Sequence, residues 1–246
     1  MSVCEVKQNL PALIIFDKDG TLIDFQSTWT PWLMALAKSL EADCEFNVSQ
    51  PLYDIMGYCE KTSTLSDSSL LAYASMDVIK EEIKGMLLKN GCEAKNVEGL
   101  LRKCWKECHS NNTKQPIPTT DLPSLFTNLH KVGVKIGVCT SDSRKSTQSA
   151  LLKLKVLELV DVIVCSDDEN MEPKPSPCGV YKICSELGVE PINSVVVGDT
   201  TDMLMGKSAG VGLILGVLTG IGTRNELAEN ADIILENIEE IWNVFD

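Results

Sequence analysis

The segment Ala12-Leu-Ile-Ile-Phe16 runs directly into Asp17-Lys18-Asp19-Gly20-Thr21-Leu22, so a short apolar run meets a polar turn. An apolar run of this length that stops at a glycine turn is typical of a strand buried on both faces of a parallel sheet. Asp17 and Asp19 then lie at the carboxyl end of that strand, where open α/β sheets place their ligands. Alone, the four residues Asp17-Lys18-Asp19-Gly20 are equally typical of a solvated surface turn.

Similar apolar runs recur along the chain and alternate with helix-compatible stretches, which predicts an open α/β sheet covered by helices. We expect the further strands at Val134–Thr140, Val160–Ser166, Ser194–Gly198, Gly212–Val217 and Asp232–Leu235. We expect the helices between them at Asp121–Lys131, Ser143–Leu157, Pro177–Leu187, Asp202–Ala209 and Arg224–Glu229.

Residues 24–115 break this alternation, because they contain no comparable strand pattern and their apolar residues recur at helical spacing. Trp29, Trp32, Leu33, Leu36, Ala37 and Leu40 show that spacing most clearly. The pattern predicts an all-helical insertion, and Asn111–Thr120, with two prolines, is the expected linker back to the sheet. The expected domains are therefore residues 1–23 with 116–246, and residues 24–115.

Other strand ends also carry polar groups. Thr140-Ser141-Asp142 follows one strand with hydroxyl groups that can donate to a phosphoryl oxygen or simply cap a helix. Glu172-Pro173-Lys174-Pro175 holds a lysine in a rigid frame, and Gly198-Asp199-Thr200-Thr201-Asp202 brings two more carboxylates to a strand end. Together with Asp17 and Asp19, these side chains should gather at one edge of the sheet.

This order of motifs resembles the haloacid dehalogenase superfamily of phosphoryl-transfer enzymes over nearly the whole chain, and Asp17-Lys18-Asp19-Gly20-Thr21 is the most specific part of the likeness. The resemblance implies a Rossmann-like parallel sheet with the helical insertion as a cap of the C1 type. The interval from Thr140 to Lys174 is too short for the alternative C2 cap. It also implies a magnesium-dependent phosphatase, most like the phosphoglycolate phosphatase branch.

The resemblance assigns roles that suit the chemistry of these groups. A phosphate monoester is a dianion, so a carboxylate can attack it only if a cation and hydrogen-bond donors offset the repulsion. Asp17 would be the nucleophile that forms an aspartyl-phosphate, and Asp19 the general acid and base. Thr140, Ser141 and Lys174 would bind the phosphoryl oxygens.

Mg²⁺, which prefers hard oxygen ligands, would be held by Asp17, the backbone carbonyl of Asp19, and Asp199. The last motif departs from the family pattern, because only two residues separate Asp199 from Asp202. Asp202 is therefore either close to the metal, outside its direct ligands, or a cap of the following helix.

Alternative functions remain open. A sugar phosphomutase of the same fold would need a cap that lets a bisphosphate intermediate turn round, and nothing in the sequence decides that. A regulatory pseudo-phosphatase would retain the fold without turnover. A 2-haloacid dehalogenase is disfavoured, because that chemistry has no use for the acid/base carboxylate and Asp19 is present. The sequence identifies neither the substrate, beyond a small phosphorylated metabolite, nor the oligomeric state.

The composition indicates which kinds of partner and which compartment to expect. With 22 basic and 35 acidic residues the net charge is −13, which disfavours nucleic acid. No apolar run is long enough to cross a membrane, and no secretion signal is visible, so we expect a cytoplasmic protein. Ten scattered cysteines fit a reducing compartment better than a disulfide framework.

A few other residues attract attention. Cys104, Cys108 and His109 lack the further ligand pair of a zinc site and are expected to be structural, and His109 and His130 are expected on helix surfaces. Phe25, Trp29 and Trp32 follow the first motif and either line a substrate pocket or pack inside the insertion.

Overall fold

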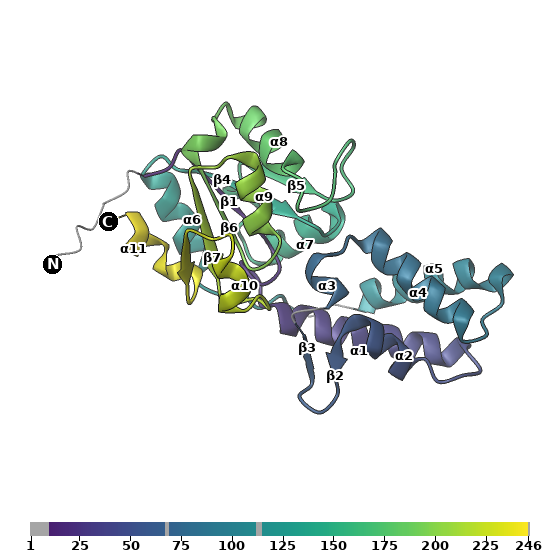
Figure 1. The fold of residues 1–246 in the computed structure, drawn as a ribbon. Helices are drawn as coiled ribbons and strands as arrows, with labels where there is room; N and C mark the ends of the chain where they lie inside the picture. Colours follow the sequence, from purple (N-terminus) through teal and green to yellow (C-terminus); the bar gives the residue numbers. More distant parts are fainter. Residues whose placement is uncertain (1–9, 67–68, 112–114, 246) are drawn as a thin grey trace. The chain divides into compact units, whose positions relative to one another are not determined.

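A computed structural model describes residues 10–66, 69–111 and 115–245, with the backbone alone for residues 109–111 (Figure 1). The chain divides into two compact units. The first contains the residues up to Asp24 together with Pro118–Asp246, and the second contains Phe25–Ile117.

The first unit is built on a six-stranded sheet with the order β5-β4-β1-β6-β7-β8, in which every pairing is parallel. The strands are β1 (Leu13–Phe16), β4 (Lys135–Thr140), β5 (Val162–Cys165), β6 (Ser194–Gly198), β7 (Leu213–Val217) and β8 (Ile233–Leu235). The six strands that the apolar runs predict are thus confirmed, with bounds that agree within two residues.

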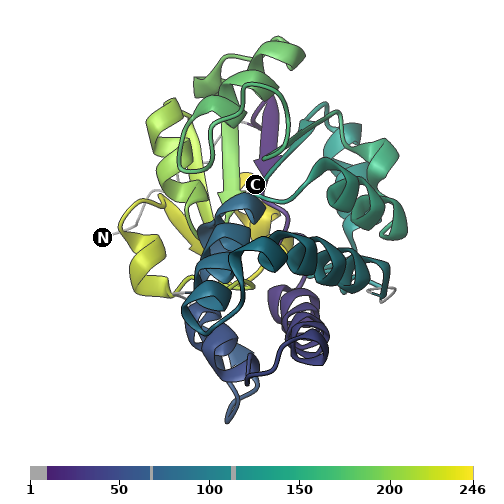
Figure 2. The ribbon, with the colours of Figure 1, turned by 90° about the vertical axis from the view of Figure 1, so that its right-hand side faces the viewer.

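Helices cover both faces of this sheet, as Figures 1 and 2 show. They are α6 (Leu122–Lys131), α7 (Arg144–Lys153), α8 (Cys178–Leu187), α9 (Asp202–Ala209), α10 (Arg224–Ala228) and α11 (Trp242–Phe245). Short 3₁₀ turns are η1 (Leu157–Leu159), η2 (Pro191–Asn193) and η3 (Ile238–Ile241). One predicted helix, Ser143–Leu157, is too long: α7 ends at Lys153 because Lys155 adopts a left-handed conformation, with φ 61°.

Alternation along β1 divides the core into two layers, because successive side chains of a strand point to opposite faces. Ile14 and Phe16 belong to the cluster that contains residues of α6, α7 and α11, and Phe16 stacks on Phe126 with ring centroids 5.4 Å apart. Leu13 and Ile15 belong to the cluster with residues of α8 and α9. All four residues of β1 are fully buried, which fixes this strand at the centre of the unit.

The carboxyl end of β1 is a topological switch point, since the chain continues to β4 and β5 on one side of it and to β6, β7 and β8 on the other. The loops after β1, β4 and β6 therefore meet at one edge of the sheet. Such crevices are where open α/β sheets bind ligands.

The second unit is mainly helical, with α4 packed against α5 and α1 against α5. Its elements are α1 (Phe25–Asp43), α2 (Ser49–Met56), β2 (Tyr58–Cys59), β3 (Thr64–Leu65), α3 (Leu70–Tyr73), α4 (Met76–Lys89) and α5 (Ala94–Asn111).

The expectation of an all-helical insertion was wrong in one segment, because β2 and β3 form an antiparallel hairpin. Gly57 ends α2 in a left-handed conformation, with φ 65°, and turns the chain into β2. The Gln26 side chain then clamps β3, since its amide nitrogen donates to the Leu65 carbonyl (2.8 Å) and its amide oxygen accepts from the Leu65 N–H (2.9 Å). Strands of two residues have no measurable period, so the sequence pattern could not reveal them.

Aromatic residues form part of the core of the second unit. Trp32 is 3% exposed, and its ring meets Trp29 and Trp105 edge-on, with centroids 5.5 Å and 5.1 Å away. Phe25 is also buried and lies next to Trp29. These contacts are those of core packing, the second of the two expectations for these residues.

Candidate active site

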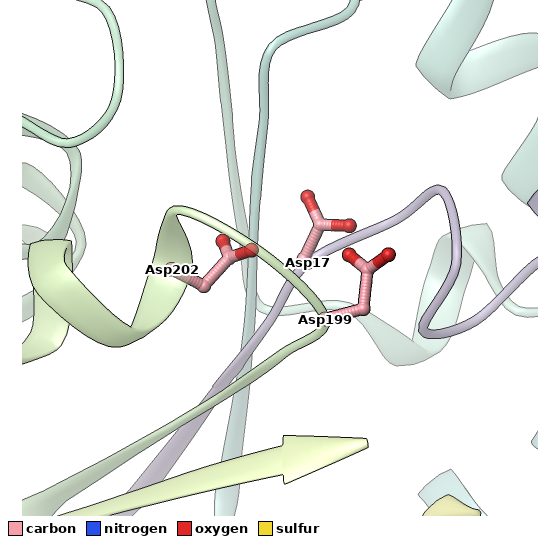
Figure 3. A group of neighbouring side chains, drawn as sticks. All are labelled: Asp17, Asp199 and Asp202. Carbon is pink, nitrogen blue, oxygen red and sulfur yellow. The ribbon is translucent and has the colours of Figure 1, made fainter. Parts of the chain in front are cut away.

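Three carboxylates from separate parts of the sequence gather at the switch point. Asp17 follows β1, Asp199 follows β6, and Asp202 is the first residue of α9. Each offers a carboxylate oxygen within 4.8 Å of the others, and Figure 3 shows the three carboxyl groups side by side. Asp199 and Asp202 are 2% and 1% exposed and Asp17 is 8% exposed, so all three acidic groups are buried close together.

Lys174, from the loop between β5 and α8, joins two of these carboxylates. Its ammonium group donates to Oδ1 of Asp17 (2.5 Å) and to Oδ1 of Asp202 (2.6 Å), and its side chain is only 6% exposed. Asp202 is therefore not a helix cap: Thr201 occupies the N-cap position of α9, and the Asp202 carboxylate bonds Lys174. The two-residue spacing after Asp199 still brings Asp202 into the cluster.

The loop after β7 holds Asp199 in place, a feature that the sequence did not indicate. The backbone N–H of Ile221 donates to Oδ2 of Asp199 (3.0 Å), and the Thr219 hydroxyl donates to the carbonyl of Gly20 (2.7 Å). Gly220 has to be glycine, because a Cβ there would lie 1.7 Å from Oδ2 of Asp199. The two glycines of Thr219-Gly-Ile-Gly222 weakly indicate a loop that approaches another part of the chain closely. They do not indicate that its partner is Asp199.

Asp19 does not join the three-carboxylate group. Its Oδ2 pairs with the ammonium of its neighbour Lys18 (2.5 Å), which also lies 3.1 Å from Oδ2 of Asp142. Oδ1 of Asp19 is buried and has no hydrogen-bond partner among the described residues. Lys18 and Asp142 were quoted in the sequence motifs, but their pairing could not be foreseen from them.

Thr140 and Ser141 come from the end of β4, on the other side of β1 from Asp199. Thr140 is 5% exposed, and its hydroxyl oxygen accepts from the N–H of Asp142 (3.1 Å), which leaves the hydroxyl proton for another acceptor. Both residues line a cavity of about 20 Å³ together with Lys174. The residues expected at the phosphate subsite thus border one water-sized space.

Burial and mutual repulsion dominate the electrostatics of the cluster. Burial raises the pKa of Asp17 to about 7, against the opposing effect of Lys174. Burial and the charges of Asp17 and Asp202 hold the pKa of Asp199 well above its usual range. Burial also raises the pKa of Asp19, while Lys18 opposes that rise. The surrounding carboxylates overcome the effect of burial on Lys174 and raise its pKa, so it stays charged.

The donor set fits a small divalent cation. Carboxylate oxygens are the ligands that Mg²⁺ prefers, and Oδ2 of Asp202 is buried without a hydrogen-bond partner. Acids whose pKa values are raised by crowding gain most from a nearby positive charge, because that charge stabilises their ionised forms. Among the described residues, Asp17, Asp199 and Asp202 are the group of His, Cys, Asp and Glu side chains close enough to share an ion.

The histidines and cysteines lie elsewhere. His130, in α6, is partly exposed and pairs with Asp161 (3.1 Å), which confirms its expected surface position, whereas the side chain of His109 lies outside the described residues. Cys104 and Cys108 are buried thiols, as expected, and the nine cysteines from Cys44 to Cys184 are free. Cys4 falls outside the described residues. No helix in the described part of the chain has the length and apolar character needed to cross a membrane.

Several known proteins are similar to this chain. A pyrophosphatase of Halalkalibacterium halodurans is 29% identical over 178 residues, which cover 67% of this chain and 81% of that protein. A validoxylamine A 7'-phosphate phosphatase of Streptomyces hygroscopicus is 37% identical over 118 residues, 48% of this chain and 54% of that relative's length. The structure is also similar to that of a predicted phosphoglycolate phosphatase from Haemophilus somnus, with a TM-score of 0.75 and 19% identity over 100% of both chains.

A family model for haloacid dehalogenase-like hydrolases matches residues 14–215, a span that runs from β1 to β7 and includes the three-carboxylate cluster and Lys174. The sheet order, the carboxylates at the switch point and the match over most of the sequence agree with one another. The chain belongs to the family of haloacid dehalogenase-like hydrolases.

Proposed function

We propose that this protein is a magnesium-dependent phosphatase that hydrolyses a small phosphorylated metabolite through an aspartyl-phosphate on Asp17. The observation that carries the proposal is the bridge from Lys174 to both Asp17 and Asp202 beside Asp199. A buried lysine among three buried carboxylates is costly to maintain, since ion pairs in a protein interior often contribute no net stability. Such an arrangement is expected where charge on a substrate has to be matched.

The chain's own residues account for each transfer of atoms. Asp17 attacks phosphorus, the bond from phosphorus to the ester oxygen breaks, and Asp19 gives its proton to the departing oxygen. Asp19 then takes a proton from water, the hydroxide attacks the phosphoryl group, and inorganic phosphate leaves with Asp17 regenerated. Lys174 and the hydroxyl of Thr140, with Ser141 beside it, would hold the phosphoryl oxygens.

Mg²⁺, when bound by Asp17, Asp199 and the backbone carbonyl of Asp19, would supply positive charge that offsets repulsion between the phosphate dianion and these carboxylates. Asp202 would act beside the metal, through Lys174 and its unpartnered oxygen. The second unit, Phe25–Ile117, would be the cap that selects the substrate.

The relatives support this class of substrate. Relatives of this chain include phosphatases of validoxylamine A 7'-phosphate and of N-acylneuraminate 9-phosphate, the latter from Mus musculus and 26% identical over 203 residues. Three of the structural neighbours are described as phosphoglycolate phosphatases by prediction only. These phosphatases point to a small phosphorylated organic molecule as the substrate, and phosphoglycolate is the first compound to test.

A sugar phosphomutase is the second candidate, favoured by the likeness to a candidate β-phosphoglucomutase from Thermotoga maritima, with a TM-score of 0.65. A mutase would return the phosphoryl group from Asp17 to sugar, whereas a phosphatase passes it to water. The experiment is a panel of phosphorylated metabolites incubated with the protein and Mg²⁺, with phosphate release and sugar-phosphate isomers measured in parallel. Mg²⁺-dependent phosphate release supports the phosphatase, isomer formation without release supports the mutase, and no product from any compound favours a non-catalytic role.

A further inference from the structure

Lys18 lies between the two aspartates of the first motif, and its side chain is directed away from solvent. Lys18 is 2% exposed. Its ammonium group lies 2.5 Å from Oδ2 of Asp19 and 3.1 Å from Oδ2 of Asp142, whose own side chain is 5% exposed. The lysine thus connects the loop after β1 to the loop after β4.

The two oxygens of Asp19 are made unequal by this contact. Oδ2 is occupied by the Lys18 ammonium, while Oδ1 is buried and has no hydrogen-bond partner in the described part of the chain. A carboxylate that exchanges a proton with substrate needs one oxygen free and the other fixed, because the free oxygen has to point at the reacting atom.

Asp142 provides a rigid anchor for the lysine. Its Oδ1 accepts from the N–H of Ser143 (2.7 Å), and its carbonyl accepts from the N–H of Ser166 (3.2 Å). Its own N–H donates to the Thr140 hydroxyl oxygen (3.1 Å). A displacement of Asp142 would therefore reach both Lys18 and the phosphate-binding side of the site.

Backbone hydrogen bonds define the turn that carries Lys18. The Lys18 backbone carbonyl accepts from the N–H groups of Leu22 (2.9 Å) and Ile23 (3.0 Å), and the N–H of Gly20 donates to the Ile23 carbonyl (2.7 Å). An apolar side chain in place of Lys18 alone would leave the carboxylates of Asp19 and Asp142 without their cation, whereas replacement of a whole buried ionic group by apolar residues is often neutral or stabilising. Since a buried ionic group as a whole often contributes no net stability, the group of Lys18, Asp19 and Asp142 calls for a role other than stability.

From these contacts we propose that Lys18 is a positioning residue, anchored by Asp142, that turns Oδ1 of Asp19 toward the ester oxygen of the substrate. The inference rests on the proposed phosphatase function. In the first step Asp19 gives its proton to the departing oxygen as the bond to phosphorus breaks, and Lys18 keeps the resulting carboxylate in place to take a proton from water in the second step.

The test compares Lys18→Met with the wild type on two substrates, an alkyl phosphate from the metabolite panel and p-nitrophenyl phosphate. The value of kcat/KM reports only steps up to transfer of the phosphoryl group to Asp17. Because p-nitrophenolate departs without a proton, kcat/KM for the aryl ester should fall less than about threefold, whereas that for the alkyl ester should fall about 10- to 100-fold. If hydrolysis of the aspartyl-phosphate also becomes slower, p-nitrophenol should be released in an initial burst equal to the enzyme concentration.

Four further variants define the outcome. Asp19→Asn gives the full size of the leaving-group effect. Lys207→Met, at a surface lysine that contacts Asn230, is the matched control and should leave kcat/KM for both esters at the wild-type value. Should Lys18→Met fail to fold, Lys18→Met/Asp142→Asn removes the unpaired Asp142 charge, and the same discrimination between esters is expected. Lys18→Arg, which keeps the charge, should recover part of the loss.

Equal losses of kcat/KM on the two esters in the folded variants, or none, would overturn the role of Lys18 and leave the phosphatase proposal intact. If the wild type itself shows no Mg²⁺-dependent hydrolysis of either ester, the proposed function fails instead. Melting temperatures of all variants separate both results from loss of fold.

Discussion

The Lys174 ammonium lies 2.6 Å from Oδ1 of Asp202, so the carboxylate at the start of α9 is part of the site although its spacing from Asp199 is short. The second oxygen of Asp202 has no hydrogen-bond partner among the described residues. A helix-capping residue would use its oxygens on the N–H groups of the first turn, which Asp202 does not do. Asp202 is therefore expected to act on the metal and on Lys174.

Asp202→Asn should raise the Mg²⁺ concentration for half-maximal activity by about 10- to 100-fold, the usual effect of losing a partner next to a metal's direct ligands. The amide keeps the shape of the side chain but removes the negative charge that would attract a bound cation. A Mg²⁺ titration of initial rates measures this shift. Asp199→Asn is the comparison, and its Mg²⁺ concentration for half-maximal activity should rise further than that of Asp202→Asn. Wild-type Mg²⁺ affinity in Asp202→Asn, with Asp199→Asn impaired, would show that Asp202 plays no part in metal binding.

Asp17→Asn should reduce turnover by at least about four orders of magnitude, which corresponds to roughly 5.5 kcal/mol of barrier, because an amide is not a nucleophile toward phosphorus. The amide oxygen can still accept from Lys174, so the variant should fold. Phosphate release and circular dichroism spectra together check the prediction. A folded variant with a tenth of wild-type activity would rule out Asp17 as the nucleophile.

The pKa of Asp17 predicts how metal-free protein responds to pH. Its pKa rises from 3.8 to about 7 on folding, so between these pH values the unfolded chain releases the proton while the folded chain keeps it. Raising the pH through this window therefore favours the unfolded state, and stability is lost. In EDTA, the melting temperature of the wild type should therefore decrease relative to that of Asp17→Asn as the pH is raised from 4 to 7.

Mg²⁺ should narrow that difference, because a bound cation stabilises the ionised carboxylate and the folded state that binds it. The melting temperature of the wild type should rise with Mg²⁺ at pH 7 more than that of Asp17→Asn. Parallel pH profiles for the two proteins without metal would contradict the raised pKa.

Gly220→Ala should weaken Mg²⁺ binding, since the added Cβ would lie 1.7 Å from Oδ2 of Asp199 and has to displace that carboxylate. We expect the Mg²⁺ concentration for half-maximal activity to rise at least about 10-fold. Gly85→Ala, in α4, is the matched control, because a Cβ there meets nothing within 4 Å and alanine favours a helix by about 1 kcal/mol. An unchanged Mg²⁺ titration in Gly220→Ala would mean that Asp199 tolerates displacement.

Replacing residues 25–117 by a short linker tests the helical unit as a cap. The remaining unit has its own hydrophobic clusters on both faces of the sheet, so it should fold. Without a cap the site would be open to water, and the ratio of rates between good and poor substrates should shrink while slow hydrolysis of small aryl phosphates persists. Retention of the wild-type ratios across the metabolite panel would show that the helical unit does not select substrates.

Local chemistry made the sheet and its carboxylates predictable. Runs such as Val195-Val196-Val197 are apolar on both faces, and only a strand covered by two layers uses such a run. Asp17 and Asp199 follow such strands directly, so their place at the edge of the sheet follows from where the strands end.

Features that depend on pairing between distant residues were not predictable. The contact of Lys18 with Asp142 and the hydrogen bond from Ile221 to Asp199 join loops that follow different strands. Neither the residue types nor their sequence neighbours indicate these partners. The hairpin of β2 and β3 is held by hydrogen bonds from Gln26, which lies in another element, α1. The secondary-structure propensities of residues reflect their neighbours along the chain, whereas these features are determined by contacts between residues that are distant in the sequence.

The central position of β1 also bears on how the chain is made. Leu13–Phe16 pairs with Lys135–Val138 on one side and with Ser194–Val197 on the other, so neither partner exists when β1 leaves the ribosome. At roughly 5–20 residues per second, this apolar segment waits several seconds for its first neighbour, while the intervening helices can already close their own core. During that interval β1 has two unpaired edges, and chaperone capture or aggregation of nascent chains should centre on this strand.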